Sequence, residues 1–536
     1  MRRPSVRSLL GRVVLVATAA SVSAATSRAQ SSQPPPPVPA PNVSALRIQR
    51  ENVFDQAENA YWLARLANSL HIVTRDYVVR RELLIPDGAP YDSATADETA
   101  RNLRKLGIFR EVAVDSARTD SGLVQQVTTR DSWSTQVYVS FKSTGDQVTW
   151  GAGVTEKNLL GSHIKASYRY TDDPDRSTSQ FSAVVPRVYQ RLGFDVSYEE
   201  LSDGKTSRFT ASSPFTALTT PQSATLEFNY ADKDVLRFFE GEEVASDTVR
   251  RLLSKGLLSA AWATSSSKLG FLRFGSTIQV RRDDFSDSTV ADEDRSVFGE
   301  FGVNVEASTS RFKVVKGYKT LTGDEDLDLS TTVRGDLWVA PGNAGYERFG
   351  VGPGVTVHLG KLVSSGFTLF DLRASSLFSN KGLDSGSVVG KAVLALFPAP
   401  RHAVILNLNG GLQKNPYPGE EFDLGLTYGP RGFPAHAFTG DRGFFTVAEY
   451  RWVAIPEVFK LFAVGVATFV DYGGAWYSGS STRTGTDAGV GLRIGSIRSS
   501  SGKGATRIDL VRRFANDVLP AKWLIAIGSG FPFDRQ

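Results

Sequence analysis

From Ser134 to the C-terminus, apolar and polar residues alternate with a period of two. The segment QVYVSFK places Val137, Val139 and Phe141 on one face, and the segments ATLEFNYAD and KWLIAIGSGF repeat this pattern further along the chain. Alternation of this kind is typical of β-strands whose two faces meet different surroundings. We therefore predict an antiparallel β-structure for most of the chain.

The alternating segments carry aromatic residues near their ends and charged residues on the polar face, which suits a membrane barrel with a polar lumen. A soluble β-domain would also alternate, and it remains the competing interpretation. Only closure of the sheet removes every unpaired strand edge from lipid. The pattern therefore predicts one transmembrane β-barrel over residues 132–536, with about twenty alternating fragments as candidate strands.

Residues 45–131 have a different, mixed pattern. The segment QAENAYWLARLANSLH has leucines at helical spacing, and TADETARNLRKLGIF reads as a second helix that ends at Gly107. An early strand, ALRIQRE, precedes these helices, and the short alternating strands REVAVDS and GLVQQVTTR follow them. This order predicts a small α+β domain in front of the barrel.

The N-terminus has the three-part layout of a secretory signal peptide. Arg2, Arg3 and Arg7 precede the apolar run VVLVATAASV, and the small residues of TSRAQ follow it, which predicts a signal peptide over residues 1–29. The next segment, residues 30–44, contains SSQPPPPVPAPN and is expected to be an extended proline-rich linker. We therefore expect an exported protein.

Composition narrows the function classes. The chain has no cysteine, so it has neither disulfides nor thiolate metal sites. Its net charge of +5 is small beside 61 basic and 56 acidic residues, so no nucleic-acid partner is expected. We expect neither a cofactor nor a metal nor an enzymatic activity, because the histidines lack metal-binding or catalytic spacing: His71, His163, His358, His402 and His436.

Two late strands place charged residues on the face expected to line the lumen. In TVAEYRWVA, Glu449 and Arg451 share a face, and a charge facing lipid near mid-bilayer would cost about 2–4 kcal/mol. In LFAVGVATFVDYGGAW, Asp471 falls on the same face as Gly465 and Gly473. An arginine is a natural partner for such a carboxylate, and a solvated aspartate is the alternative.

At this point the chain resembles a known family. PRGF in a long loop, followed by EYR and FVDYGGAW, resembles the closing third of the BamA/TamA superfamily of outer-membrane assembly proteins. The segment RRELLIPDGAPYDSATADETARNLRKLGIFREVAV is similar to a POTRA domain, the polypeptide-transport-associated module. NLLG, at Asn158 to Gly161, is similar to a turn between the early barrel strands.

The resemblance implies a barrel of sixteen strands with a periplasmic POTRA-like domain over residues 45–131. It also implies a loop that folds back into the lumen, where the arginine of its RGF motif contacts inward acidic residues. On this chain the motif is Arg431, Gly432 and Phe433, with Asp471 as the matching carboxylate and Glu449 as a weaker second candidate.

The resemblance further implies a lateral seam between the first and last strands, at which pairing is weak. The residues that we assign to it are Val137, Val139, Phe141, Ile525, Ile527, Gly528 and Gly530. Glycines in the last strand would weaken packing there. The family's POTRA edges receive extended substrate segments by strand addition.

The leading hypothesis is therefore a bacterial outer-membrane protein that inserts or translocates unfolded outer-membrane or secreted proteins. Its other expected partners are outer-membrane lipids and periplasmic or lipoprotein accessory factors. The alternatives are a transporter of one partner protein, as in two-partner secretion, and a passive channel or surface structural barrel. The chain departs from the family in having room for one POTRA domain, in ending on DRQ after Phe533, and in Pro430 before the motif's arginine.

Overall fold

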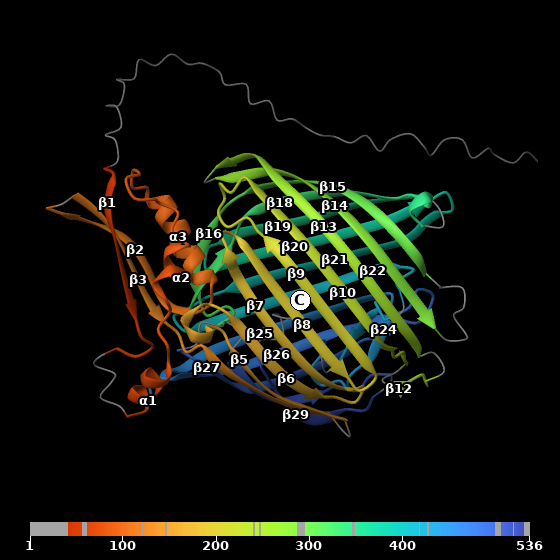
Figure 1. Ribbon diagram of the computed structural model, residues 1–536. Coiled ribbons are helices and arrows are strands. Elements are labelled where there is room, and N and C mark those ends of the chain that lie inside the picture. The colour runs from red at the N-terminus through yellow and green to blue at the C-terminus, as the bar shows by residue number, and fades with distance from the viewer. Residues whose placement is uncertain are drawn as a thin grey trace, which may run out of the picture. The chain divides into compact units, whose positions relative to one another are not determined.

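The computed structural model describes residues 41–55, 62–120, 122–144, 147–239, 242–245, 248–267, 269–286, 295–345, 349–417, 419–425, 428–498, 505–517 and 519–529. The predicted signal peptide and most of the predicted linker, residues 1–40, lie outside this part of the chain. The described residues form a small mixed domain followed by a large barrel (Figure 1). None of the helices described is long and apolar enough to cross a membrane.

The N-terminal domain is a three-stranded sheet with helices. Its elements are β1 (Val43–Glu51), α1 (Trp62–Leu70), α2 (Asp76–Arg80), α3 (Ser93–Lys105), β2 (Phe109–Thr119) and β3 (Gly122–Asp131). The sheet order is β1-β3-β2, with β1 parallel and β2 antiparallel to β3. Strand β1 thus begins at Val43, inside the segment assigned to the linker. The core between α2, α3 and the sheet includes Val79, Leu103, Phe109 and Val127.

Helix α3 begins at a side-chain cap. The carboxylate of Asp92 accepts a hydrogen bond from the backbone N–H of Thr95 at 2.8 Å, which satisfies one of the free donors of the first turn. Ala96, Ala100 and Leu103 then face the domain interior, as the helical spacing in the sequence predicts. The positive φ of Gly107 (66°) follows the end of this helix.

A closed antiparallel barrel follows, and its described part has twenty wall strands. They are β4 (Thr135–Thr144), β5 (Gln147–Glu156), β6 (Lys165–Asp172), β7 (Ser177–Tyr189), β8 (Leu192–Leu201), β9 (Gly204–Ser213), β10 (Gln222–Val235), β13 (Val249–Ser267), β14 (Gly270–Ser286), β15 (Arg295–Thr309), β18 (Thr331–Ala340), β19 (Gly350–Val363), β20 (Gly366–Ser379), β21 (Gly382–Leu396), β22 (His402–Lys414), β25 (Arg442–Val458), β26 (Phe462–Trp476), β27 (Gly485–Ser496), β28 (Ala505–Arg513) and β29 (Lys522–Ser529).

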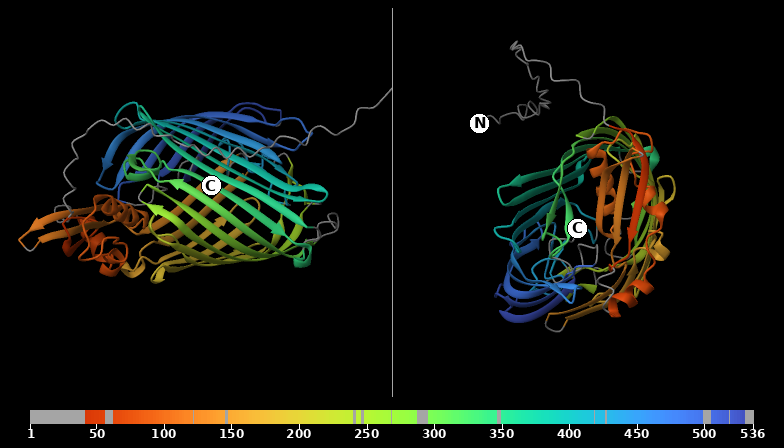
Figure 2. Two further views of the ribbon diagram at one scale, coloured as in Figure 1. Left: turned by 90° about the horizontal axis from the view of Figure 1, so that it is seen from above. Right: turned by 90° about the vertical axis from the view of Figure 1, so that its left-hand side faces the viewer.

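The expected number of sixteen strands is therefore wrong. That number came from the resemblance, whereas the alternation in the sequence offered about twenty fragments. The described wall holds twenty strands, each hydrogen-bonded to a neighbour on both sides. Barrel diameter grows with strand number, so four additional strands widen the lumen. The strands cross the barrel at a tilt, which is visible from the side in Figure 1 and from above in Figure 2.

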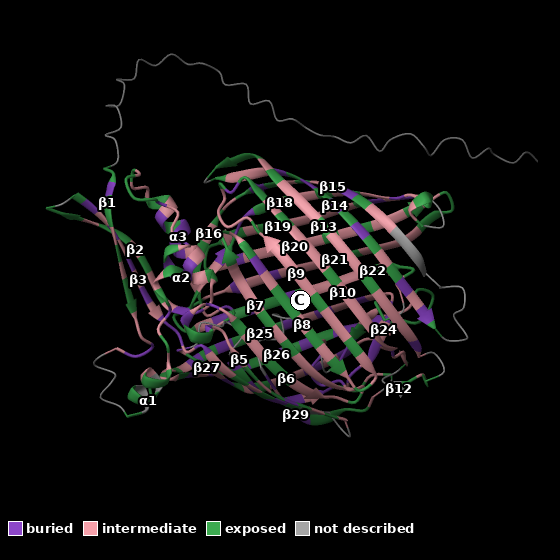
Figure 3. Cartoon of the chain, viewed as in Figure 1, coloured by how far each residue is buried: buried purple, intermediate pink, exposed green. Residues whose placement is uncertain are grey.

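The two faces of the wall differ as the period of two predicts. On β26, Val466 and Val470 are exposed on the outside, whereas Ala467, Phe469 and Asp471 are buried on the inside. Exposed and less exposed residues alternate along many of the wall strands (Figure 3). The outer face therefore carries apolar side chains, and the buried charged groups of β25 to β28 lie on the inner face.

Strand directions define two ends of the barrel. We call the end at which β4 begins, next to the N-terminal domain, the domain end, and the opposite end the loop end. At the domain end, the connection from β15 to β18 contains a hairpin of β16 (Phe312–Lys316) and β17 (Asp324–Asp328). Short connections at this end include a 3₁₀ turn at Leu159–Gly161.

The loop end carries two further strand pairs. One is β11 (Phe238–Phe239) with β12 (Glu242–Glu243), and the other is β23 (Phe422–Leu424) with β24 (Phe438–Gly440). A short 3₁₀ turn at Gly342–Ala344 lies between β18 and β19. The pair of β23 and β24 belongs to the long connection that carries the RGF motif.

Candidate functional site

The RGF motif lies in the connection between β22 and β25 and is buried inside the barrel. Phe433 is fully buried and Arg431 is only 6% exposed, although both belong to a loop. A buried loop must find partners for its polar groups within the protein. The strands that supply these partners are β25, β26, β27 and β28.

Arg431 binds the carboxylate of Asp471 side-on. Its Nε donates to Oδ2 at 2.7 Å, and its Nη2 donates to Oδ1 at 3.0 Å. The backbone N–H of Arg431 lies 3.3 Å from the same Oδ2. Two parallel charge-assisted hydrogen bonds fix both the position and the plane of the guanidinium. The structure thus brings together the arginine and the carboxylate that the sequence singled out.

Two further carboxylates and one aromatic ring surround the same guanidinium. Nη1 of Arg431 lies 3.3 Å from Oδ2 of Asp509 and 3.6 Å from Oε2 of Glu449. The Cζ atom lies 3.5 Å from the centre of the Phe469 ring, so the cation also stacks on an aromatic face. Glu449 is therefore a contact of Arg431, but at a longer distance than Asp471.

Gly432 lies where the loop backbone closely approaches the barrel wall. Its backbone N–H donates to Oδ2 of Asp487 at 2.8 Å, and its carbonyl accepts from Nη1 of Arg513 at 3.2 Å. A Cβ atom on Gly432 would lie 3.0 Å from the Cβ of Asp487 and 3.2 Å from that of Arg513. A side chain at this position would therefore require its neighbours to move by a few tenths of an ångström.

Phe433 anchors the loop by apolar packing. It lies in a buried cluster with Leu424, Phe438 and Phe445, and its ring centre is 5.1 Å from that of Phe438. A Cβ atom on Gly485 of β27 would lie 2.2 Å from Cζ of Phe433, so the ring fills the space that this glycine leaves in the wall. The three motif residues thus supply a charge, a close backbone approach and an apolar anchor.

The charges continue beyond Arg431 as a buried network. Glu449 accepts hydrogen bonds from Arg493 at 2.9 Å and from Arg451 at 3.1 Å. Arg493 also donates to Asp509 at 2.5 Å. Glu449, Arg451, Arg493 and Asp509 thus each have an opposite charge within hydrogen-bond distance, which is the condition under which buried ions are tolerated.

Sequence reasoning missed several members of this network: Asp487, Arg493, Arg507, Asp509 and Arg513. A signal was present, because GTDAGVGLRIG and ATRIDLVRR alternate so that these residues fall on the inner face of β27 and β28. The alternation does not predict which inner residues lie at the same position along the barrel axis, because this depends on the register between neighbouring strands.

Glycines in the wall make space for the network. A Cβ atom on Gly491 would lie 2.0 Å from Oδ1 of Asp509 and 2.8 Å from Nη1 of Arg493. A Cβ atom on Gly489 would lie 2.5 Å from Cζ of Phe469, the ring beneath Arg431. Both glycines are therefore needed for the charged and aromatic groups to approach β27.

The network also reaches the domain end of the barrel. Nη1 of Arg451 donates to the carbonyl of Tyr318 at 3.1 Å, and Tyr318 belongs to the connection between β16 and β17. Tyr318 and Leu321 are buried in one cluster with Phe367 of the wall. One lumen arginine therefore links the RGF loop, through Glu449, to the hairpin from the opposite end.

The first and last wall strands, β4 and β29, are neighbours in the barrel, and the lateral seam that the resemblance implies between them stays a prediction. In the described residues, one register pair, Ala526 with Lys142, joins these strands, whereas eight pairs join β28 and β29. Val137, Val139, Phe141 and Ile525 are exposed on the outer face, Ile527 is partly exposed and Gly528 is buried. Gly530 lies outside the described residues.

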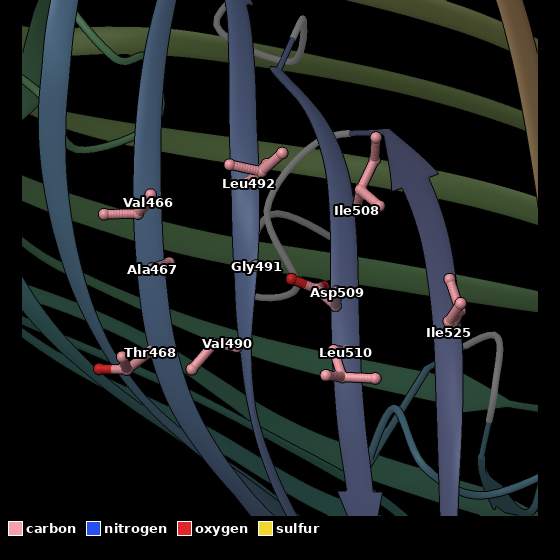
Figure 4. A pocket seen from close by; sticks show the side chains of 10 residues that line it. All are labelled: Val466, Ala467, Thr468, Val490, Gly491, Leu492, Ile508, Asp509, Leu510 and Ile525. Carbon is pink, nitrogen blue, oxygen red and sulfur yellow. The ribbon is translucent and has the colours of Figure 1, made fainter.

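A shallow apolar pocket of about 530 Å³ lies beside the seam on the outside of β26 to β29 (Figure 4). Its lining includes Val466, Leu492, Ile508 and Ile525. It lies on the outer side of the strands whose inner face binds Arg431. At the level of Arg431 along the barrel axis, these strands are therefore apolar on the outer face and charged on the inner face.

The arrangement favours a structural role for these charges. Within the described residues, no group of three histidine or acidic side chains is placed to hold a metal ion. The carboxylates are engaged by arginines and by the loop backbone. What the geometry can do is hold a loop against four wall strands next to the seam.

Comparison with known proteins gives a loose match. No family model matches the chain. The barrel resembles those of BamA and CdiB. BamA from Haemophilus ducreyi lacking POTRA domains 1–3 is 12% identical with a TM-score of 0.39, over 91% of this chain and 84% of that one. CdiB from Acinetobacter baumannii is 12% identical with a TM-score of 0.42, over 91% and 73%. CdiB from Escherichia coli is 11% identical with a TM-score of 0.44, over 95% and 92%. Similarities at this level do not assign a function to the chain.

Proposed function

We propose that this protein is a bacterial outer-membrane barrel that inserts or translocates other proteins, and that its substrates leave through the seam between β4 and β29. The observation that carries the proposal is the pairing at this seam in the described residues, where one register pair, Ala526 with Lys142, joins the two strands, whereas the neighbouring strands pair along their length. Within the described residues, opening the barrel here therefore separates less strand pairing than opening it between β28 and β29 or between β4 and β5. The free-energy cost of opening the wall sideways is therefore expected to be lowest between β4 and β29.

Placement in a membrane is supported by the outer face of the wall. Trp150, Phe181, Leu258, Val303 and Leu406 are all exposed, and they come from different wall strands. Apolar surface on this scale would be unfavourable in water and favourable against lipid. The predicted signal peptide agrees with export to the outer membrane, with the N-terminal domain in the periplasm.

Substrate capture is assigned to the N-terminal domain. The order β1-β3-β2 leaves β1 and β2 as the edge strands of its sheet. An extended polypeptide can add to such an edge through backbone hydrogen bonds. This role corresponds to that of a POTRA domain, which the sequence of this segment resembles. Periplasmic or lipoprotein accessory factors would bind on the same side of the membrane.

The RGF loop serves as a latch in this proposal. Arg431, Gly432 and Phe433 hold the loop to the inner face of β25 to β28, next to the last strand β29. The loop therefore fixes the shape of the wall on one side of the seam. A structural role at this position would explain why the latch is buried and charge-paired, without any catalytic role.

A disulfide across the seam tests the proposal. The chain has no cysteine, so Ala526→Cys with Lys142→Cys creates a single thiol pair at facing positions. Oxidised protein in vesicles should fail to insert a urea-denatured barrel substrate, and reduction should restore insertion. Insertion is read from the heat-dependent gel migration of the folded substrate.

A matched control places the same crosslink inside the wall. Leu510→Cys with Ile525→Cys joins facing residues of β28 and β29, where pairing is already continuous. The oxidised control should insert substrate as well as the unmodified protein does. If the seam-locked protein also inserts substrate at the unmodified rate, the lateral exit is wrong.

The alternatives differ in what they require of the lumen. A passive channel needs an open path, but the RGF loop and the connection between β16 and β17 both contribute buried side chains to the interior. A transporter of one partner protein would have to displace these segments. It would also keep working with the seam locked, which separates it from the leading proposal.

A further inference from the structure

We propose that helix α1 lies in the surface of the membrane, with its apolar face in the lipid of the leaflet on the domain side of the barrel. The proposal uses the membrane placement given above but does not depend on insertion or translocation. Its basis is an exposed apolar stripe on a helix that the chain holds at the rim of the barrel.

The stripe consists of Trp62, Leu66 and Leu70, followed by Ile72. Their exposed fractions are 64%, 48%, 69% and 50%. Residues four apart lie on the same face of a helix, so the first three form one continuous row. A soluble domain of this size would normally bury such a row against its own core.

The opposite face of α1 is tied to the domain. The side chain of Asn68 donates to the carbonyl of Phe54 at 2.9 Å and accepts from the backbone N–H of Phe54 at 3.1 Å. The carbonyl of Asn68 also lies 3.3 Å from Nδ2 of Asn52. These contacts hold the helix through its polar side. The apolar row is therefore left pointing away from the chain segment to which α1 is bound.

The segment that follows α1 is bound to the barrel itself. Thr74 accepts a hydrogen bond from Asn158 at 2.8 Å, and the backbone N–H of Arg75 donates to the carbonyl of Gly161 at 2.8 Å. Nε of Arg75 also donates to the carbonyl of Leu160 at 3.0 Å. Asn158 to Gly161 form the turn between β5 and β6, which lies at the domain end.

This attachment limits how far α1 can be from the edge of the lipid. From Leu70 to Thr74 the chain advances four residues, which span at most about 14 Å. On the barrel side, Val154 is an exposed outward residue of β5 and lies only a few residues before the turn. The end of the helix is therefore within reach of the apolar band around the wall.

The turn adds apolar surface of its own. Leu159 and Leu160 are 40% and 57% exposed, although they lie in a short turn beside polar residues. Leu160 has a φ of 54°, a left-handed conformation that is unfavourable for a bulky side chain and is held here by the contacts to Arg75. Exposed leucines beside an exposed helix face at one rim indicate a shared apolar environment.

Lipid is the occupant that fits this location best. An amphipathic helix with tryptophan and leucine on one face lies in the plane of the membrane interface. Tryptophan in particular favours the level of the lipid headgroups. Arg75 is exposed just after the helix, where its guanidinium would meet lipid phosphates, whereas the exposed Arg80 pairs with Asp76 at 2.7 Å. A protein partner on the same face is the alternative outcome of the test.

The test places single cysteine labels in the full chain, which has no cysteine of its own. Leu66→Cys reports on the stripe, Asp120→Cys on the exposed tip of the β2–β3 hairpin, and Val490→Cys on the outer wall of the barrel. Each carries an environment-sensitive fluorophore in vesicles of phosphatidylethanolamine and phosphatidylglycerol. Lipids that carry a nitroxide are present in both leaflets. The measured fluorescence quenching therefore does not depend on the orientation of the protein in the vesicle.

The label at Leu66 should be quenched at least about threefold more by a nitroxide near the headgroup than the label at Asp120. The proposal is overturned if the Val490 label is quenched while the Leu66 label behaves like that at Asp120. Failure of quenching at Val490 would instead contradict the membrane placement of the barrel. Protection of the Leu66 label by added protein alone, without lipid quenching, would also overturn the lipid assignment.

Discussion

Nε of Arg431 lies 2.7 Å from Oδ2 of Asp471, and the two residues come from a loop and a wall strand that are 40 positions apart. Because Asp471 is fully buried, removing the arginine leaves a carboxylate without its main partner. We expect Arg431→Ala to destabilise the barrel by about 3–5 kcal/mol. The measurement is the urea midpoint of folding, read from heat-dependent gel migration.

The control for this variant is Arg282→Ala, which removes an exposed arginine paired with Asp284 on β14. An exposed ion pair contributes less than about 1 kcal/mol, so its midpoint should hardly move. Arg431→Lys should lie between the two variants, because lysine keeps the charge but lacks the planar fork. Equal midpoints for Arg431→Ala and Arg282→Ala would show that the latch is not structural.

Gly491 offers a test of the space that the network needs. In Gly491→Ala the new methyl group would lie 2.0 Å from Oδ1 of Asp509, so Asp509 or β27 must move. We expect a loss of about 1–3 kcal/mol in stability, measured by the same urea midpoint. Gly335→Ala on β18 is the matched control, since its methyl group would meet nothing within 4 Å. A similar loss in both variants would point to a general effect of replacing strand glycines.

Local pattern was sufficient to predict much of the architecture. The alternation placed Asp471, Glu449 and Arg451 on the inner face, where the structure has them buried. The helical spacing and the short strands of residues 45–131 predicted β1, α1, α3, β2 and β3 of the N-terminal domain. These features depend on residues close in sequence, so a single chain carries the signal.

The parts that the sequence did not predict depend on distant contacts. The number of wall strands follows from which fragments pair side by side, and the family resemblance implied sixteen where the described wall has twenty. Likewise, Asp487 and Asp509 meet the RGF loop, and Arg493 meets Asp509, only because of the stagger of β27 and β28. Alternation with a period of two predicts which face of the wall a residue occupies. It does not predict the position of that residue along the barrel axis.

His436 should make the barrel sensitive to alkaline pH. It lies at the loop end, with Nε2 2.8 Å from Asp175 and Nδ1 2.5 Å from Asp423, so it ties the RGF loop to the turn between β6 and β7. Burial alone would lower the pKa of His436, but hydrogen bonds to the two carboxylates raise it from 6.5 to about 9. The histidine is therefore charged at neutral pH.

The sign of the effect follows from this raised pKa. Protonated His436 stabilises the folded barrel by at most about 3 kcal/mol. This stabilisation is fully present below pH 6.5 and is lost as the pH rises through 9. We expect the urea midpoint to fall between pH 7 and pH 10 in the unmodified protein. His436→Gln, which cannot be charged, should flatten that part of the profile. An unchanged slope in the variant would exclude His436 as its source.

The hairpin of β16 and β17 should limit ion flow through the lumen. Arg451 holds it through the carbonyls of Tyr318 and Gly317, at 3.1 and 3.3 Å. Phe312 and Asp328 face each other in register, so a four-residue Gly-Ser linker can replace residues 313–327 without stretching the wall. We expect the single-channel conductance of this variant in planar bilayers to rise several-fold, because buried side chains leave the lumen.

The control for the shortened hairpin keeps its length and changes only its surface. Lys316→Ser with Asp324→Ser removes a mostly exposed ion pair and should leave the conductance unchanged. Heat-dependent gel migration checks that both variants are folded. If the folded, shortened variant conducts like the unmodified protein, the hairpin does not obstruct the lumen. The RGF loop, which enters from the other end and is held by Arg431, would then be the remaining barrier within the described residues.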